Sequence, residues 1–126
     1  MNGLDSYRDV NRYASVGEAT PHELVRLMFD GLLTRVNEAR GHIERGEIAA
    51  KGERIGKALG IVEGLHMSLD KERGGEIAAN LEQLYEYMSR VLLRANFEND
   101  VAALDEVASL VREIKAGWES IGSAGT

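Results

Sequence analysis

The side chains that come closest to a metal site are Glu63 and His66, which are three residues apart. Di-iron sites in helix bundles use two Glu-x-x-His pairs and further inward-facing glutamates, because the irons need several carboxylate and imidazole ligands. This chain has one such pair, and Glu38 with His42 has the wrong spacing to supply the second. A metal-dependent bundle enzyme centred on Glu63 and His66 remains an alternative, but we expect no metal and no cofactor.

Residues for other kinds of chemistry are not arranged as those reactions need. The chain has no cysteine, and its seven serines lie in no nucleophile-elbow setting. The Gly74-Gly75 pair lacks the Lys-Ser/Thr that follows in a phosphate-binding P-loop. The acidic runs lack the ligand spacing of a calcium-binding EF-hand loop. The sequence therefore predicts a protein that is not an enzyme.

Composition predicts one soluble globular domain. The 126 residues are 44% hydrophobic and 29% charged, which suits a single hydrophobic core. The net charge of -6 and the scattered Lys and Arg argue against nucleic acid as a partner. No apolar run reaches the roughly 18 residues of a membrane span, and the polar N-terminus lacks a signal-peptide core. We expect a cytoplasmic protein with no membrane insertion.

Helical spacing of apolar residues marks four stretches, at about 21–45, 48–69, 76–96 and 101–121. Thr20 is a suitable N-cap before Pro21, and Gly46 a suitable stop after the first stretch. We expect the second stretch to break at Gly74-Gly75, and Asn99 or Asp100 to cap the fourth. Short connections make neighbouring helices antiparallel, so the predicted fold is an all-α, antiparallel, up-down four-helix bundle.

The expected organisation is an N-terminal arm at 1–19, the bundle at 20–121 and a frayed tail at 122–126. Glycine recurs every four residues in the second helix, at Gly52, Gly56, Gly60 and Gly64. Each glycine weakens a helix by up to ~1 kcal/mol relative to alanine. Two interpretations stay open: a tolerated, poor helix, or a stripe that lets something approach closely.

The first helix carries more apolar residues than one face can hold, among them Leu24, Leu27, Met28 and Leu33. Tyr87 and Leu93 add apolar surface to the third helix. In the arm, apolar residues recur every three positions, at Leu4, Tyr7, Val10, Tyr13 and Val16. The surplus could complete the core or form a groove for a partner helix, and spacing alone does not separate the two. We expect Trp118 in the core and His22 at the surface.

Four short motifs follow one another along the chain: Leu27-Met28-Phe29-Asp30-Gly31-Leu32-Leu33, Ser68-Leu69-Asp70, Leu81-Glu82-Gln83-Leu84-Tyr85-Glu86-Tyr87-Met88, and Leu92-Leu93-Arg94-Ala95-Asn96 with Asn99-Asp100. In this order and spacing, over about residues 4–121, they resemble the flagellin-specific export chaperones of the FliS family. Gly56-Lys57-Ala58 and Trp118 fit the same pattern.

The resemblance implies a cytoplasmic chaperone without enzyme activity. Such a protein binds the disordered C-terminal segment of flagellin, prevents premature polymerisation and assists delivery to the flagellar type III export gate. It also implies that the arm covers apolar surface until flagellin binds, and Tyr7 and Val10 are the matching arm positions. The expected partner-binding residues are Tyr7, Val10, Leu24, Leu27, Met28, Leu33 and Tyr87. We expect a monomer or weak homodimer; the alternative is an adaptor whose apolar surplus forms a tight homodimer.

Overall fold

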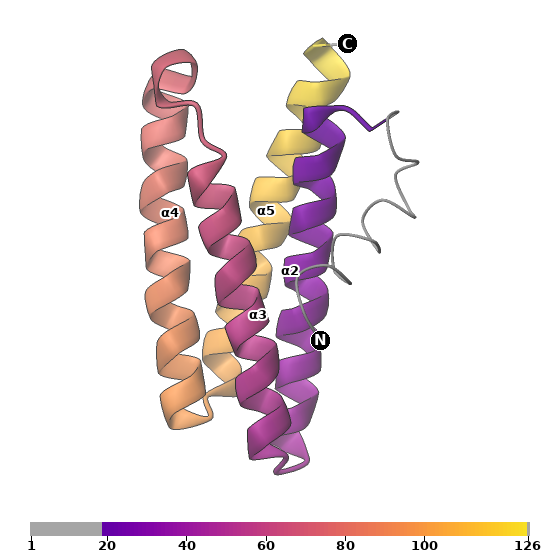
Figure 1. Ribbon diagram of the computed structural model, residues 1–126, viewed down its shortest axis with the longest axis vertical. Coiled ribbons are helices and arrows are strands. Elements are labelled where there is room, and N and C mark those ends of the chain that lie inside the picture. The colour runs from indigo at the N-terminus through magenta and orange to yellow at the C-terminus, as the bar shows by residue number, and fades with distance from the viewer. Residues whose placement is uncertain (1–18, 126) are drawn as a thin grey trace.

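The computed structural model describes residues 19–125, which form four α-helices. They are α2 (Pro21–Glu44), α3 (Ile48–Met67), α4 (Lys71–Glu98) and α5 (Val101–Gly125) (Figure 1). Helix α2 packs against α3 and α5, and α4 packs against the same two helices. Short connections make sequence neighbours antiparallel. The predicted all-α four-helix bundle is confirmed.

The proposed division of the chain remains a prediction. Nearly all of the expected arm, with Tyr7 and Val10, lies outside the described residues. Helix α5 continues to Gly125, into the segment that the sequence predicted to be a frayed tail.

Both ends of α2 are closed as their residue types predict. The Thr20 hydroxyl accepts a hydrogen bond from the Glu23 amide at 3.1 Å, and Pro21 occupies the first helical position. At the other end Gly46 has a φ of 73°, a left-handed conformation that glycine adopts without strain. The Glu47 amide then donates to the His42 carbonyl at 2.8 Å. These bonds pair backbone groups that the helix ends would otherwise leave free.

Between α3 and the body of α4 the chain leaves helical geometry at two places. Helix α3 ends at Met67, and the Asp70 carboxylate caps α4 by accepting from the Arg73 amide at 3.0 Å. Gly74 and Gly75 therefore lie inside α4, where Gly75 alone is non-helical, with φ 49° and ψ -123°. An aspartate cap begins a helix as effectively as a glycine pair ends one. Gly75 thus separates a short first segment of α4 from its long body, and the break that the sequence predicts at Gly74-Gly75 is present.

The last connection uses its two polar residues for different tasks. Asn99 ends α4 in a left-handed conformation with φ 53°. The Asp100 carboxylate accepts from the Ala103 amide at 3.2 Å and so caps α5. One residue stops a helix and the next begins one, which keeps this connection short.

The core consists of aliphatic side chains and two aromatic ones. Its largest fully buried members come from all four helices and are Phe29, Leu32, Ile55, Leu65, Met88, Leu92, Leu104, Val36, Val62, Val91, Val107 and Val111. One charged residue, Lys51 on α3, is also buried, and its ammonium donates to the Asn96 carbonyl at 2.7 Å. The last turn of α4 has no basic residue of its own, so Lys51 supplies positive charge to that helix end.

Candidate partner-binding surface

The bundle has one end at which α2 begins, α3 ends, α4 begins and α5 ends, and we call it the open end (Figure 1). His22 in the first turn of α2 meets Trp118 of α5 there. The indole N–H of Trp118 donates to the His22 carbonyl at 2.9 Å. The His22 ring nitrogen Nε2 lies 2.6 Å from the Trp118 carbonyl, to which it donates when protonated there. This pair fixes how α2 and α5 lie at the open end.

One edge of the apolar stripe of α4 becomes more exposed toward the open end. Met88 is fully buried, and Leu84 and Leu81 are half-buried. Ile77 continues the same stripe one turn further, at helical spacing, yet its side chain is 61% exposed. Ala78 in the same turn is buried, so this turn still packs on the bundle and Ile77 lies at the exposed edge of the stripe.

The apolar stripe of α5 behaves in the same way. Val111 is fully buried, Ile114 and Trp118 are half-buried, and Ile121 is 53% exposed. Because α4 and α5 are antiparallel and joined by a short connection, Ile77 and Ile121 lie at similar heights in the bundle. The apolar residues toward the ends of the two stripes, which we call the open-end surface, are Ile77, Leu81, Leu84, Ile114, Trp118 and Ile121.

Three of the predicted residues of α2, Leu24, Leu27 and Met28, lie near the same end. Leu24 is exposed, Leu27 is half-buried, and Met28 packs against the core. The Met28 methyl group lies 3.0 Å from the point where a Cβ at Gly64 would stand. Gly64 therefore permits close contact between α2 and α3. Met67, at the end of α3, adds a side chain that is 78% exposed.

Tyr87 and Leu33 are not brought together with this group. Tyr87 lies on α4, which does not pack against α2 in the described structure. Its hydroxyl donates to the Glu106 carboxylate of α5, and this hydrogen bond, followed by burial, raises the pKa of Tyr87. Leu33 is half-buried against the core. The predicted partner-binding set therefore occupies several parts of the bundle, and its role stays a prediction.

The residues considered for metal chemistry have other partners. His66 pairs through Nε2 with Glu82 at 2.8 Å, while Glu63 is exposed. His42 pairs with Glu47 at 2.7 Å, and Glu38 pairs with Arg35 at 2.9 Å. Over residues 19–125, no three His, Cys, Asp or Glu side chains form a group that could hold a metal ion. None of the described helices is both long and apolar enough to cross a membrane.

Comparison with known proteins decides the family. The model of the family described as flagellar protein FliS matches residues 3–125. The chain belongs to the FliS family. The flagellar secretion chaperone FliSB of Pseudomonas aeruginosa is 49% identical over 121 residues, which cover 96% of each chain. The flagellar secretion chaperone FliS of Salmonella typhimurium is 43% identical, over 95% of this chain and 90% of its own.

A more distant FliS relative shows the same extent of similarity. The flagellar secretion chaperone FliS of Vibrio cholerae is 39% identical, over 94% of this chain and 87% of its own. The likeness therefore spans the bundle as a whole and is not confined to one motif. The resemblance read from the sequence motifs is confirmed.

Sequence reasoning missed the open-end surface of this FliS chain. Ile77 and Ile121 fit the apolar stripes of their helices, so their spacing predicts that they belong to the core. Their position near helix ends was a signal, because the ends of a bundle have fewer neighbouring helices. How far the other helices extend to cover them is a property of the assembled bundle.

Proposed function

We propose that this protein is a flagellar secretion chaperone that holds the C-terminal segment of flagellin in the cytoplasm. In doing so it prevents premature polymerisation and assists delivery to the flagellar type III export apparatus, without catalysing a reaction. Membership of the FliS family supports the chaperone class, since the relatives in three bacteria are named flagellar secretion chaperones.

The observation that best supports a client-binding role is the exposure of two isoleucines at the ends of the α4 and α5 stripes. Ile77 and Ile121 are 61% and 53% exposed although they continue stripes that are fully buried further along. Full burial of a large aliphatic side chain is worth about 1.5–3 kcal/mol. A partner that covers Ile77 and Ile121 therefore gains a substantial share of this free energy for each side chain. In this proposal the exposed aliphatic side chains receive an amphipathic helix with anchors at i, i+3, i+4 and i+7.

A disordered client fits the need for later release. Ordering a segment on binding costs roughly 2–5 kcal/mol of the gross interaction energy, which keeps affinity moderate for a large contact area. In this proposal the arm, through Tyr7 and Val10, competes with the client for apolar surface. Leu24, Leu27 and Met28 contribute contacts from the α2 side.

Titration calorimetry tests the proposal directly. Full-length flagellin should bind, and flagellin without its C-terminal segment should give no heat of binding. Normal affinity for the truncated flagellin would contradict the proposal. Tyr7→Ala and Val10→Ala should alter flagellin binding while the helical content stays unchanged, and unchanged binding would remove the arm from the mechanism.

Light scattering of the isolated protein is the control for self-association. We expect a monomer or a weak homodimer, which leaves the apolar surface free for the client. A tight dimer that does not bind flagellin would show instead that a second copy of the chain covers this surface.

A further inference from the structure

Two lysines of α3 have opposite environments. The Lys51 ammonium donates to the Asn96 carbonyl at 2.7 Å. The Lys57 side chain is half-buried, but its ammonium nitrogen is shielded from solvent and, in the described structure, has no hydrogen-bond partner. Its nearest carboxylate oxygen belongs to Glu53, at 4.0 Å. A buried charge without a hydrogen bond destabilises the protein that carries it, so Lys57 needs an explanation.

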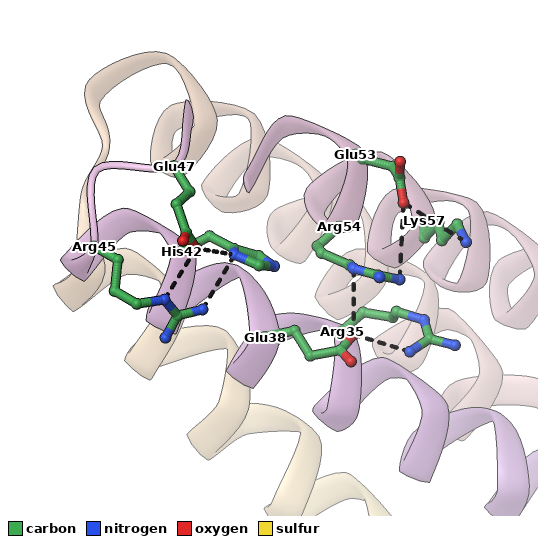
Figure 2. Close-up of polar contacts among 8 residues, drawn as sticks. All are labelled: Arg35, Glu38, His42, Arg45, Glu47, Glu53, Arg54 and Lys57. Atoms are coloured by element: carbon green, nitrogen blue, oxygen red, sulfur yellow. Dashed lines mark hydrogen bonds and ion pairs between the residues drawn. The ribbon is translucent and has the colours of Figure 1, made fainter. Parts of the chain in front are cut away.

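Lys57 belongs to a group of charges on the face shared by α2 and α3 (Figure 2). The Arg54 guanidinium lies 3.6 Å from Glu38 and 3.8 Å from Glu53, both longer than a hydrogen bond. Glu38 is bonded at 2.9 Å to Arg35 of its own helix. The group, which we call the α2–α3 cation cluster, has Arg35, Arg54 and Lys57 as cations and, among residues 19–125, Glu38 and Glu53 as carboxylates. It has one positive charge in excess, in a chain whose net charge is -6.

A partner chain can come close to this cluster. Gly56 and Gly60, on either side of Lys57 in the sequence, are exposed, and a Cβ added to either would meet no atom within 4 Å. The outer surface of α3 is therefore bare backbone beside the cluster. The flexible four-carbon stem of lysine allows the Lys57 ammonium to turn toward an approaching acceptor.

We propose that the α2–α3 cation cluster is a second contact for the client, and that it binds an acidic side chain of the bound flagellin segment. This inference rests on the proposed function. A client carboxylate would accept hydrogen bonds from Lys57 and Arg54, whose donors are incompletely used in the free protein. One excess positive charge matches a single carboxylate, whereas a phosphate backbone would be repelled by the acidic remainder of the chain.

The proposal predicts opposite effects on folding and on binding when Lys57 is replaced by methionine. Methionine keeps much of the apolar stem and removes a charge that has no hydrogen bond, so the urea midpoint should stay equal or rise. Client affinity should fall about tenfold at ~0.05 M salt, because the client carboxylate loses its partner. The difference should narrow at ~0.5 M salt, where screening weakens charge pairs.

Arg73→Met is the matched control, because it removes one positive charge from a side chain that is 92% exposed on α4. Its affinity for the client should equal that of the wild type. Wild-type affinity in Lys57→Met would overturn the inference. An equal loss of affinity in Lys57→Met and Arg73→Met would also overturn it, because that result would indicate only long-range electrostatic attraction. A lowered urea midpoint in Lys57→Met would overturn it too, since the lysine would then be structural.

The acidic client residue is found by replacing each acidic residue of the segment with its amide. One of these replacements should weaken binding to the wild-type protein but cause no further loss of affinity in the Lys57→Met variant. A double-mutant cycle gives this result when two residues form a direct pair. No coupled residue would contradict the inference while leaving the proposed function intact. Absence of binding by the wild-type protein would instead contradict the proposed function itself.

Discussion

Trp118 stacks on His22 with ring centroids 4.6 Å apart and ring planes 6° from parallel. Each residue also has a ring nitrogen at hydrogen-bond distance from the other's carbonyl oxygen. The sequence predicted a core tryptophan and a surface histidine, and the structure makes both of them half-buried partners. The pair joins the first turn of α2 to α5, which are far apart in the sequence.

Replacing Trp118 with alanine should lower the free energy of unfolding by about 2–4 kcal/mol, because the stacking, the indole hydrogen bond and apolar contact are lost together. His22→Ala should cost less, about 1–2 kcal/mol, because it removes a smaller ring. Urea unfolding followed by circular dichroism measures both. A Trp118→Ala protein as stable as the wild type would show that the pair does not hold α2 to α5.

Ile77→Ser should weaken flagellin binding about tenfold or more while changing stability by less than about 0.5 kcal/mol, because the side chain is mostly exposed in the free protein. Ile48→Ser is the matched control: Ile48 is 52% exposed at the opposite end of the bundle, at the start of α3. Calorimetric titration of both variants decides the matter. Equal losses of affinity would remove the special role of the open end.

Two glycines in helices should respond to alanine with opposite signs. Gly75 has a φ of 49°, which strains any residue with a Cβ, so Gly75→Ala should destabilise the protein by about 1–3 kcal/mol. Gly60 is helical and open to solvent, so Gly60→Ala should stabilise it by about 1 kcal/mol. Thermal unfolding measures both shifts. A stabilised Gly75→Ala variant would show that the kink in α4 is not needed.

Lys51→Met should lower the free energy of unfolding by about 1–3 kcal/mol, because the Asn96 carbonyl loses its charged donor inside the protein. The exposed Arg112 provides the control, and Arg112→Met should change stability by less than about 0.5 kcal/mol. Urea unfolding compares the two. Together with Lys57→Met, this experiment contrasts two lysines of one helix, of which only Lys51 has a hydrogen-bond partner among residues 19–125.

Glu82 should make stability depend on acidic pH. Hydrogen bonds from Lys71 and then from His66 lower the pKa of Glu82 below its ordinary 4.5. Because the folded pKa is lower than the unfolded one, this stabilisation is complete above about pH 4.5 and is lost as the pH falls through the folded pKa. The difference in unfolding free energy between wild type and Glu82→Gln should therefore shrink on acidification. Glu76→Gln, which alters an exposed carboxylate, is the control: the difference in unfolding free energy between wild type and this variant should not shrink on acidification.

Local signals in the sequence sufficed for most helix ends. Thr20, Pro21 and Gly46 act on backbone groups a few residues away, so their types determine where α2 starts and stops. Two local signals act before the body of α4. Asp70 caps a short first segment, and Gly75 separates that segment from the long helix that follows, where the sequence predicted a break.

Contacts between helices could not be predicted from the sequence. Spacing assigns Ile77 and Ile121 to apolar stripes but cannot say that the other helices stop short of covering them. The burial of Lys51 likewise depends on how the end of α4 lies against α3. Whether a residue completes the core or remains available to a client is decided by relative helix lengths.

The neighbouring positions of α2 and α5 determine when during synthesis this protein can finish folding. Every other packing pair joins helices that follow one another in the chain, so those contacts can form as each helix leaves the ribosome. The contact between α2 and α5 must wait for the last helix to be made. Until then the faces of α2 and α4 that α5 covers remain open to solvent, and the nascent chaperone is itself prone to aggregation.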